Sequence, residues 1–515
     1  MNRFAELDHR YVWHPFTQMR DWLRQEPIVI SSGRGAWLRD VHGRKYLDAN
    51  SSIWTNLHGH GHPRLNAAIE RQLKRIAHSS ALGFANEPAS VLAEKLVAAA
   101  QVVPGPSPVA AGVTGLPLNE NRSLRTSDAA IRRHPLHPKD KLAKVFFGDN
   151  GSTALEVALK LAYEFTRRTR GPKSRPKFLS LAGAYHGDTV GAVSLGHIDL
   201  FHKSFAGLLF QSDQVMAPYC YRCPFNRARP QREDARNYRR CHWECVGLVA
   251  KKFAAQKRRG NPYAAFVYEP LMQGAAGMVP QPDGWLVQVT DIARAHGALL
   301  IADEVMTGFG RTGQVDGAAR QHHPAGKEAA PAPLFASTRT GVQPDFLCLA
   351  KGLTGGYLPM CATLTTGRVF EAFLGKYEEF KSFFHGHTYT GNQLAAAVGL
   401  ASLELLQSAA SVRARVALQK TLQTELASLW SLPQVGDIRQ VGLVAGVELV
   451  KNWRTRAPYD LRERAGIRVC EAMARRGVLT RPVGSVLVLM PPYCTTPQEA
   501  KRMVAALHAA VEETL

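Results

Sequence analysis

Residues 346–356 read FLCLAKGLTGG, an apolar run that ends at a lysine and is followed by a glycine-rich turn. A run that is apolar at nearly every position predicts a strand buried on both faces, as in a parallel sheet. Most lysines are exposed surface groups. A lysine that ends a buried strand near an anionic ring can instead be an amine with a lowered pKa that forms a Schiff base. We therefore take Lys351 as the first candidate catalytic residue.

Similar apolar runs lie on both sides of this stretch, and helical patterns separate them. The predicted strands are residues 145–147, 178–181, 265–268, 299–302, 346–349 and 361–364. This alternation predicts an α/β domain with a mostly parallel sheet flanked by helices. Nearer the N-terminus, residues 35–48 predict a β-hairpin. A helix should follow, because Leu65, Ile69, Leu73 and Ile76 recur at helical spacing.

A turn rich in small residues, GDNGSTA at 148–154, separates the first predicted strand from a helix over 155–167. Backbone N–H groups of Gly151 and Ser152 at a helix N-terminus suit a phosphate. Simple capping by Ser152 or Thr153 explains the same residues equally well. The turn matches neither the P-loop nor the dinucleotide-binding pattern, which argues against ATP and NAD as ligands.

Two further motifs follow predicted strands. In GAYHGDT at 183–189, Tyr185 could stack on a planar ring or be an ordinary core tyrosine. In IADE at 301–304, an apolar strand delivers Asp303 into a buried position. A buried carboxylate is costly unless a cation pairs with it, and a protonated pyridine ring is such a cation. The alternative, a cap on the next turn, is weaker because glycines at 308, 310 and 313 follow.

The bulk composition bounds the class of protein. At 515 residues, 45% hydrophobic and 21% charged, the chain is typical of a globular protein with more than one domain. A net charge of +22 could indicate nucleic acid, a membrane surface or anionic small molecules. The basic residues form no single tract, and the densest group lies at 227–240. We therefore expect a solvated arginine-rich surface and no nucleic-acid partner.

No apolar run reaches the roughly 18 to 20 residues of a membrane helix. The first residues, MNRFAE, lack the layout of a secretory signal. We expect no membrane association and a cytoplasmic location.

Eight cysteines in so long a chain do not suggest a disulfide framework. Four of them cluster at Cys220, Cys223, Cys241 and Cys245. Two cysteine pairs could hold a structural zinc ion, but the spacing of the second pair is imperfect. We therefore favour a loop of reduced cysteines and no metal.

Taken in order, the phosphate turn, the aromatic residue, the aspartate and the lysine resemble the class III (ω-) aminotransferases, pyridoxal-phosphate (PLP) enzymes of fold type I. The resemblance covers nearly the whole chain. It implies a large PLP-binding domain over residues 86–385 and a smaller α+β domain formed by residues 1–85 and 386–515. Apparent insertions lie at about 103–141, 217–246 and 321–342. It also implies a homodimer whose active sites lie at the subunit interface.

The resemblance assigns roles to individual residues. Lys351 would carry PLP, Asp303 would hold its pyridine nitrogen, and Tyr185 would pack against its ring. The further cofactor-binding positions are Gly151, Ser152, Glu269, Gln273, His387 and Thr388 of the partner subunit. The substrate-binding positions are Phe16, Trp54, Tyr185, Lys351, Gly386 and Arg481, with Arg481 near a carboxylate that its planar fork suits.

Several stretches resemble one branch of the family more closely. They are WHPFTQM at 13–19, SSIW at 51–54, FHGHTYTGN at 384–392, TRPVG at 480–484 and MPPY at 490–493. That branch converts 8-amino-7-oxononanoate to 7,8-diaminononanoate in biotin synthesis, with S-adenosylmethionine or L-lysine as amino donor. Members that use S-adenosylmethionine commonly have Tyr, Trp and Pro where this chain has Phe16, Ile53 and His387, which favours lysine. The alternatives are an ω-aminotransferase for another amine and, more remotely, a basic nucleic-acid-binding protein.

Overall fold

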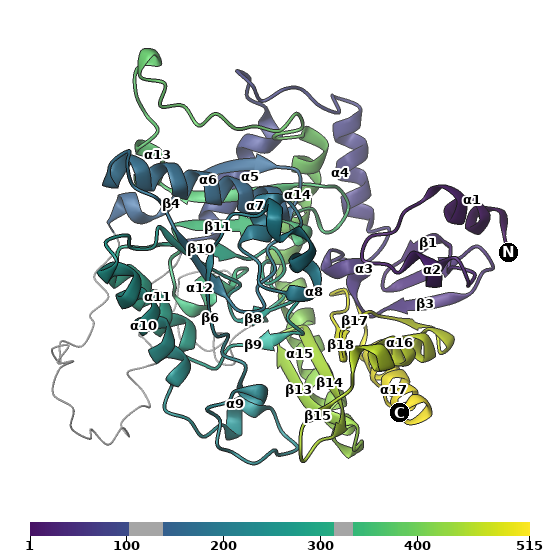
Figure 1. The fold of residues 1–515 in the computed structure, drawn as a ribbon. Coiled ribbons are helices and arrows are strands. Elements are labelled where there is room, and N and C mark those ends of the chain that lie inside the picture. Colours follow the sequence, from purple (N-terminus) through teal and green to yellow (C-terminus); the bar gives the residue numbers. More distant parts are fainter. Residues whose placement is uncertain (102–136, 314–332) are drawn as a thin grey trace, which may run out of the picture.

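The computed structural model describes residues 1–101, 137–313 and 333–515. Most of the insertion expected at 103–141, and residues 321–332 of the one expected at 321–342, lie outside these ranges. Figure 1 shows a large domain built around one sheet and a smaller domain that contains both chain ends. The fold is of the α/β class that the sequence predicts.

The central sheet of the large domain has seven strands in the order β4-β12-β11-β10-β7-β5-β6. Their bounds are β4 (Leu142–Gly148), β5 (Phe178–Leu181), β6 (Asp213–Val215), β7 (Ala265–Tyr268), β10 (Leu299–Asp303), β11 (Phe346–Leu349) and β12 (Cys361–Thr366). β12 runs antiparallel to both of its neighbours, and the pairs from β11 to β6 are parallel. All six predicted strands are confirmed. No apolar run predicts β6, because it is short and reads DQV.

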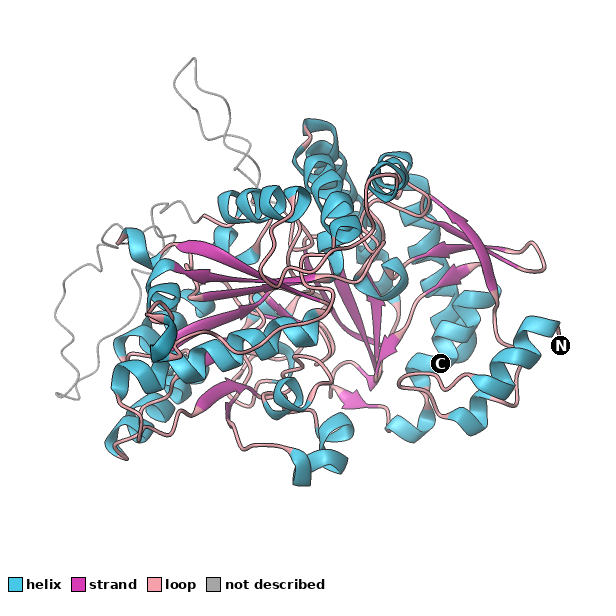
Figure 2. Ribbon diagram, turned by 90° about the horizontal axis from the view of Figure 1, so that it is seen from above, coloured by secondary structure: helices cyan, strands magenta, loops and turns pink. Residues whose placement is uncertain are grey.

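Helices cover both faces of this sheet (Figure 2). One face packs on α6 (Gly151–Arg170), and the other packs on α5 (Glu87–Ala99), α10 (Glu244–Arg258) and α11 (Trp285–Ala295). Successive side chains of β10 alternate between these two cores: Ile301 packs with α6, and Leu300 packs with the opposite layer. The same alternation turns Asp303, at the end of the strand, toward the α6 side.

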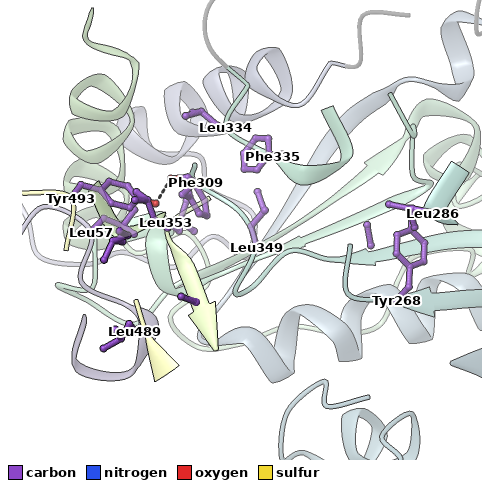
Figure 3. Close-up of a cluster of buried hydrophobic side chains, with 14 of the residues drawn as sticks. Leu57, Tyr268, Leu286, Phe309, Leu334, Phe335, Leu349, Leu353, Leu489 and Tyr493 are labelled. Carbon is purple, nitrogen blue, oxygen red and sulfur yellow. Dashed lines mark hydrogen bonds between the residues drawn. The ribbon is translucent and has the colours of Figure 1, made fainter. Parts of the chain in front are cut away.

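The opposite core continues toward the small domain (Figure 3). Leu349 and Leu353, on either side of Lys351, are completely buried there. The hydroxyl of Tyr493, near the C-terminus, donates a hydrogen bond of 2.9 Å to the carbonyl of Phe309. Packing on both sides of Lys351 therefore fixes the position of the strand end that carries it.

The small domain joins the two ends of the chain. The hairpin of β2 (Trp37–Asp40) and β3 (Lys45–Asp48) is confirmed, and β3 pairs in parallel with β16 (Val478–Leu479). β1 (Ile30–Arg34) completes this sheet. A second sheet contains β13 (Val435–Val441), β14 (Val444–Asn452), β15 (Ala457–Pro458), β17 (Pro482–Val483) and β18 (Val486–Leu489). Its helices include α16 (Ala465–Arg475) and α17 (Pro497–Thr514).

Three segments differ from expectation. The helix predicted from Leu65 ends at Leu73 as α4 (Pro63–Leu73), and Leu73 and Ile76 are 58% and 45% exposed instead of packed. Residues 333–342 are not a surface insertion, because Phe335 and Ala336 are buried and the amides of Ala336 and Ser337 donate to the buried Glu304. The segment 217–246 also has a buried part, described below.

Among the described residues no single helix is both long and apolar enough to cross a membrane. A pair of helices bent by 68°, at 393–407 and 409–431, meets the length and composition criteria only when taken together.

Candidate active site

A cavity of about 730 Å³ opens beside the ends of β10 and β11 and the start of α6. Ligands of open α/β sheets bind at this edge, outside the carboxyl ends of the strands. Seven of the predicted site residues line the cavity: Trp54, Gly151, Ser152, Tyr185, Glu269, Asp303 and Lys351.

Asp303 ends β10 and is held from two sides. Its Oδ2 lies 2.7 Å from Nδ1 of His186, and its Oδ1 accepts a 3.0 Å hydrogen bond from the N–H of Val305. The side chains of Asp303 and His186 are both buried. Burial by itself would lower the pKa of His186, but the hydrogen bond and charge of Asp303 raise it overall. His186 therefore forms a charge-assisted pair with the carboxylate.

Lys351 follows the end of β11 by two residues and begins a short 3-10 turn, in a strained backbone conformation with φ of +42°. Its Nζ lies 5.0 Å from the ring centroid of Trp54. Burial lowers the pKa of the amine, although the carboxylates of Asp303 and Glu269 oppose this shift. Lowering the pKa of a lysine by burial activates its amine as a nucleophile.

The first turn of α6 offers free backbone N–H groups that could bind an anion. Asn150 caps the helix through the amide of Thr153, so Ser152 is not the cap. The amides of Gly151 and Ser152 stand in the first turn, where a helix supplies no acceptor. A Cβ on Gly151 would come within 2.7 Å of the Val305 side chain, so the chain approaches closely at this point. Thr153 contributes to the cap through its hydroxyl, which accepts from the Asn150 amide.

Tyr185 belongs to an aromatic group on one wall. Its hydroxyl donates a 2.6 Å hydrogen bond to Asp188, and burial raises its pKa well above the ordinary value. Its ring is stacked near His202 and lies edge-on to Phe201. Phe16 packs on Phe201 at 5.2 Å and does not line the cavity. The predicted substrate position Phe16 is thus one ring removed from Tyr185.

Glu269 lies on the floor of the cavity and is buried. Its Oε2 accepts a 2.8 Å hydrogen bond from the amide of Gly274, and its Oε1 has no partner among the described residues. Burial raises the pKa of Glu269 to about 7.

The remaining predicted positions do not line the cavity. Gln273 is buried and donates to the carbonyl of Ala182. His387 lies behind the wall, with its Nδ1 3.2 Å from a carboxylate oxygen of Asp149, which does line it. Gly386, Thr388 and Arg481 are exposed on the surface.

Sequence reasoning missed His186 and Asp188, which both line the cavity. Both lie in the 183–189 motif, but a loop sequence carries no periodicity that predicts which side chains point inward. The only available signal was the succession of an aromatic residue, a histidine and an aspartate around Gly187.

The four clustered cysteines are free thiols. Burial raises the pKa of Cys220 to about 12 and that of Cys245 to about 11. The guanidinium of Arg239 donates to the sulfur of Cys241 at 3.1 Å. Within residues 1–101, 137–313 and 333–515, no group of three or more ligating side chains is arranged to hold a metal ion. The absence of zinc stays a prediction.

The groups around the cavity match the chemistry of PLP. The phosphate needs N–H donors, which the first turn of α6 offers. The pyridine nitrogen needs a buried carboxylate, and the aldehyde needs an amine with a lowered pKa. Asp303 and Lys351 meet these needs in one cavity. The fold and this set of groups define a PLP-dependent transferase of fold type I.

Comparison with known proteins gives the family. The chain matches the model of the class III aminotransferases over residues 19–326 and 329–511. It is 42% identical over 506 residues to the adenosylmethionine-8-amino-7-oxononanoate aminotransferase of Geobacter sulfurreducens, an alignment that covers 98% of this chain and 96% of that protein.

Two solved structures agree. The adenosylmethionine-8-amino-7-oxononanoate aminotransferase of Methanocaldococcus jannaschii is 35% identical, with a TM-score of 0.81 and 99% of each chain covered. The ω-transaminase of Pseudomonas jessenii in complex with PMP is 27% identical, with a TM-score of 0.81, covering 100% of this chain and 98% of that one. This chain belongs to the class III aminotransferase family. It is a PLP-dependent aminotransferase.

Proposed function

We propose that this enzyme transfers an amino group to 8-amino-7-oxononanoate and forms 7,8-diaminononanoate in biotin biosynthesis. The names of relatives that are 42% identical over nearly the whole chain support this substrate. The observation that carries the proposal is that Trp54, in the 51–54 segment, and Lys351, after β11, line the same cavity. Trp54, from the SSIW stretch typical of that branch, lies 5.0 Å from the amine of Lys351.

The cofactor would be held by groups already described. PLP, when bound, supplies a ring that takes up the electron pair left when a proton leaves the substrate's α-carbon. Asp303 would hold a proton on the ring nitrogen, and the amides of Gly151 and Ser152 would bind the phosphate. Tyr185 would pack beside the ring. Glu269, Gln273, His387 and Thr388 of the partner subunit are the other cofactor-binding positions that we propose.

Lys351 would move the proton of the reaction. Its amine, whose pKa burial lowers, would accept the proton from the α-carbon of the donor. In the second half-reaction the same amine returns a proton to carbon 7 of the keto acid.

The charge of the cavity favours a donor with a second positive group. Four carboxylates line it: Asp149, Asp188, Glu269 and Asp303. Asp188 is exposed, and its carboxylate accepts a hydrogen bond from the hydroxyl of Tyr185. Lysine and S-adenosylmethionine both carry a second cationic group. We propose lysine, on the evidence of Phe16, Ile53 and His387.

Arg481 would bind the carboxylate of the keto acid. It is exposed and makes no ion pair with a carboxylate of the described residues. Val483, two residues further on, packs in a cluster with Trp54 and Met306, and both of these line the cavity. The packing of Val483 beside Trp54 supports the proposal that Arg481 acts near this wall of the cavity.

Replacing Arg481 with Gln should weaken the keto-acid half-reaction much more than the donor half-reaction. Losing a charge-assisted pair with a carboxylate costs about 2 to 5 kcal/mol when the partner is left unpaired. Stopped-flow measurement of the two half-reactions separates them. Arg462→Gln, also on the surface of the small domain, is the matched control. Equal losses in both half-reactions of Arg481→Gln would count against this role.

We further propose a homodimer with active sites at the subunit interface. Two neighbouring loops expose large apolar side chains, with Leu82 89% and Phe384 78% exposed. His78 joins these loops by a 3.0 Å contact with the carbonyl of Thr388. Contiguous exposed apolar residues mark protein–protein interfaces. We propose a cytoplasmic location because all eight cysteines are free thiols, as in a reducing compartment.

The direct test is a single-turnover assay of the purified, PLP-loaded enzyme. We expect 7,8-diaminononanoate to form from 8-amino-7-oxononanoate with lysine as donor, measured by mass spectrometry. S-adenosylmethionine replaces lysine in a parallel reaction. Product with S-adenosylmethionine alone would reverse the donor assignment and leave the keto-acid substrate in place.

A second function has its own support. The similarity to the P. jessenii ω-transaminase extends over the whole chain, so another amine is an alternative substrate. Transfer from a simple ω-amine to pyruvate, without any product from 8-amino-7-oxononanoate, would favour that function.

A further inference from the structure

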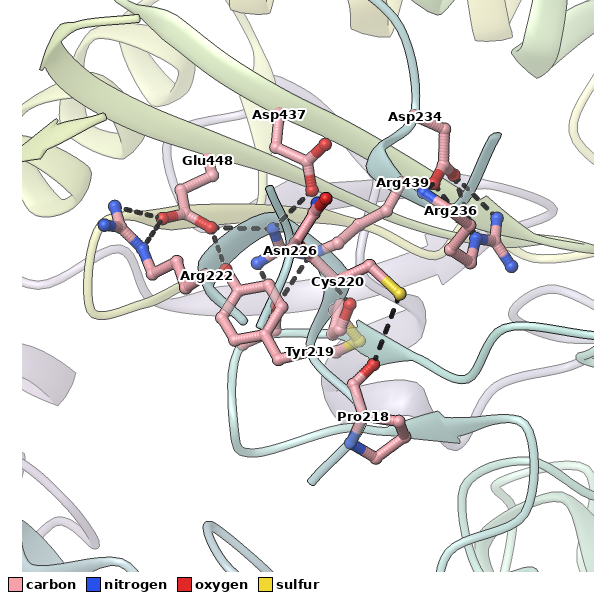
Figure 4. Close-up of polar contacts among 12 residues, drawn as sticks. Pro218, Tyr219, Cys220, Arg222, Asn226, Asp234, Arg236, Asp437, Arg439 and Glu448 are labelled. Atoms are coloured by element: carbon pink, nitrogen blue, oxygen red, sulfur yellow. Dashed lines mark hydrogen bonds and ion pairs between the residues drawn. The ribbon is translucent and has the colours of Figure 1, made fainter. Parts of the chain in front are cut away.

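Arg439 of β13 is completely buried at the joint between the two domains. Its Nη1 donates to Asp437 at 2.9 Å and to Glu448 at 2.7 Å (Figure 4). Glu448 has two more partners, the hydroxyl of Tyr219 and the guanidinium of Arg222. The segment 217–246 is thus anchored on the small-domain sheet, and its basic side chains are not all solvated.

The other nitrogens of Arg439 bind backbone of the large domain. Its Nε donates to the carbonyl of Met278 at 2.8 Å, and its Nη2 donates to the carbonyl of Gly277 at 2.5 Å. These carbonyls belong to the turn between β8 (Met272–Gln273) and β9 (Val279–Pro280). Gly277 and Met278 both have positive φ, of 99° and 53°. A turn with such a backbone persists only where its surroundings hold it.

This turn continues to the floor of the active-site cavity. The amides of Gly277 and Met278 donate to the carbonyl of Gly274 at 3.1 and 3.0 Å. The amide of Gly274 donates in turn to the carboxylate of Glu269 at 2.8 Å. A series of hydrogen bonds through the residues of this turn therefore runs from the guanidinium of Arg439 to a carboxylate that lines the cavity.

We propose that Arg439 is a positioning residue of the active site, which holds the 274–278 turn so that the amide of Gly274 orients the carboxylate of Glu269. Arg439 is not needed merely to balance the charge of Glu448, because Arg222 also forms an ion pair with that carboxylate. Among the described residues, the side-chain hydrogen bonds to the carbonyls of Gly277 and Met278 come from Arg439. The inference rests on the proposed function in one respect: it assumes that Glu269 acts on the molecules bound in the cavity.

The proposal predicts a change in the protonation of Glu269. Its pKa is raised to about 7, because burial and the charge of Asp303 outweigh the opposing effects of His186 and of the amides of Gly274 and Tyr185. The amine of Lys351 also faces this carboxylate. Because the Gly274 amide stabilises the ionised form, loosening the turn should raise the pKa. A rise of about one unit would lower the ionised fraction of Glu269 near neutral pH.

The test variant is Arg439→Lys. Lysine keeps a positive charge beside Asp437 and Glu448, but its single nitrogen has three donors and cannot serve both carboxylates and both carbonyls of the turn. The readout is the carbonyl band of the protonated Glu269 side chain in infrared spectra of the full-length protein. The spectra span about pH 5 to 9, a range that includes the raised pKa of Glu269. Glu269→Gln identifies the band, and spectra are recorded with and without cofactor. We expect the midpoint to rise by about one unit.

Two further variants keep the test decisive. Gly277→Ala disturbs the same turn from the other side, since φ of 99° strains any residue with a Cβ, and it should shift the midpoint in the same direction. Arg222→Lys alters the same Glu448 without touching the turn and should leave the midpoint unchanged. In a Glu269→Gln background, Arg439→Lys should no longer shift the pH profile of turnover.

An unchanged midpoint in Arg439→Lys and Gly277→Ala, or an equal shift in Arg222→Lys, would overturn the proposal and leave Arg439 a structural residue. These outcomes do not depend on the substrate, because the band is measured without one. Failure of the proposed function would instead appear in the single-turnover assay.

Discussion

Lys351→Ala is expected to abolish transamination while the protein still folds and still binds PLP without a covalent bond. Lys351 is the lysine that lines the cavity, and burial lowers the pKa of its amine. General acid–base catalysis alone contributes a factor of about 100 to 10,000, and the covalent role adds to it. The loss should therefore exceed about 10,000-fold in kcat/KM.

Borohydride reduction of the PLP-loaded enzyme, followed by peptide mapping, identifies the modified lysine directly. The label should lie on the peptide that contains Lys351 and be absent from the Lys351→Ala protein. Lys420→Ala, an exposed lysine on α15 (Ala409–Leu426), is the matched control and should keep both label and activity. Label on any other lysine would contradict the assignment.

The central strands could be predicted because burial on both faces leaves a plain mark on the sequence. β10 and β11 are apolar at every position up to their last residues, and both are completely enclosed. β6 escaped prediction because an edge strand of three residues needs no apolar run. The α/β class follows from the same signal, since only a sheet covered on both sides buries such strands.

The site could be predicted where its residues end a buried strand or closely follow one, as Asp303 and Lys351 do. For Asp303, the last residue of β10, the alternation of side chains along the strand also fixes the direction of the side chain. His186 and Asp188 could not be predicted, because they lie in a loop whose shape depends on distant contacts. The amide of Asp188, for example, donates to the hydroxyl of Ser152 on α6.

The arginine-rich composition of residues 217–246 suggested a solvated surface, and this prediction was wrong for part of the segment. Arg232 instead donates to the carbonyls of Trp430, Leu432 and Val435 in the small domain. A guanidinium has five donors in a planar fork, so it can serve backbone carbonyls in a partly buried joint as well as water. No local sequence pattern distinguishes these two uses, because the acceptors are about 200 residues away.

Asp303→Asn is the second substitution with a large expected effect. It should keep the shape of the site, because an amide oxygen can still accept from the amide of Val305. It removes the negative charge that would keep a proton on the ring nitrogen of PLP. Electrostatic terms of this kind are worth on the order of 3 kcal/mol, which is a factor of ~100 or more in rate.

The same substitution at Asp345 separates catalysis from folding. Asp345 is also buried, but it accepts from the amide of Leu300 near the opposite end of β10, far from the cavity lining. Asp345→Asn should lower the midpoint of thermal unfolding with little change in turnover, whereas Asp303→Asn should lower turnover much more than stability. Steady-state rates and thermal unfolding of both proteins provide the comparison. Near-normal turnover in Asp303→Asn would mean that the pair with His186, at 2.7 Å, serves only to hold the end of β10 in place.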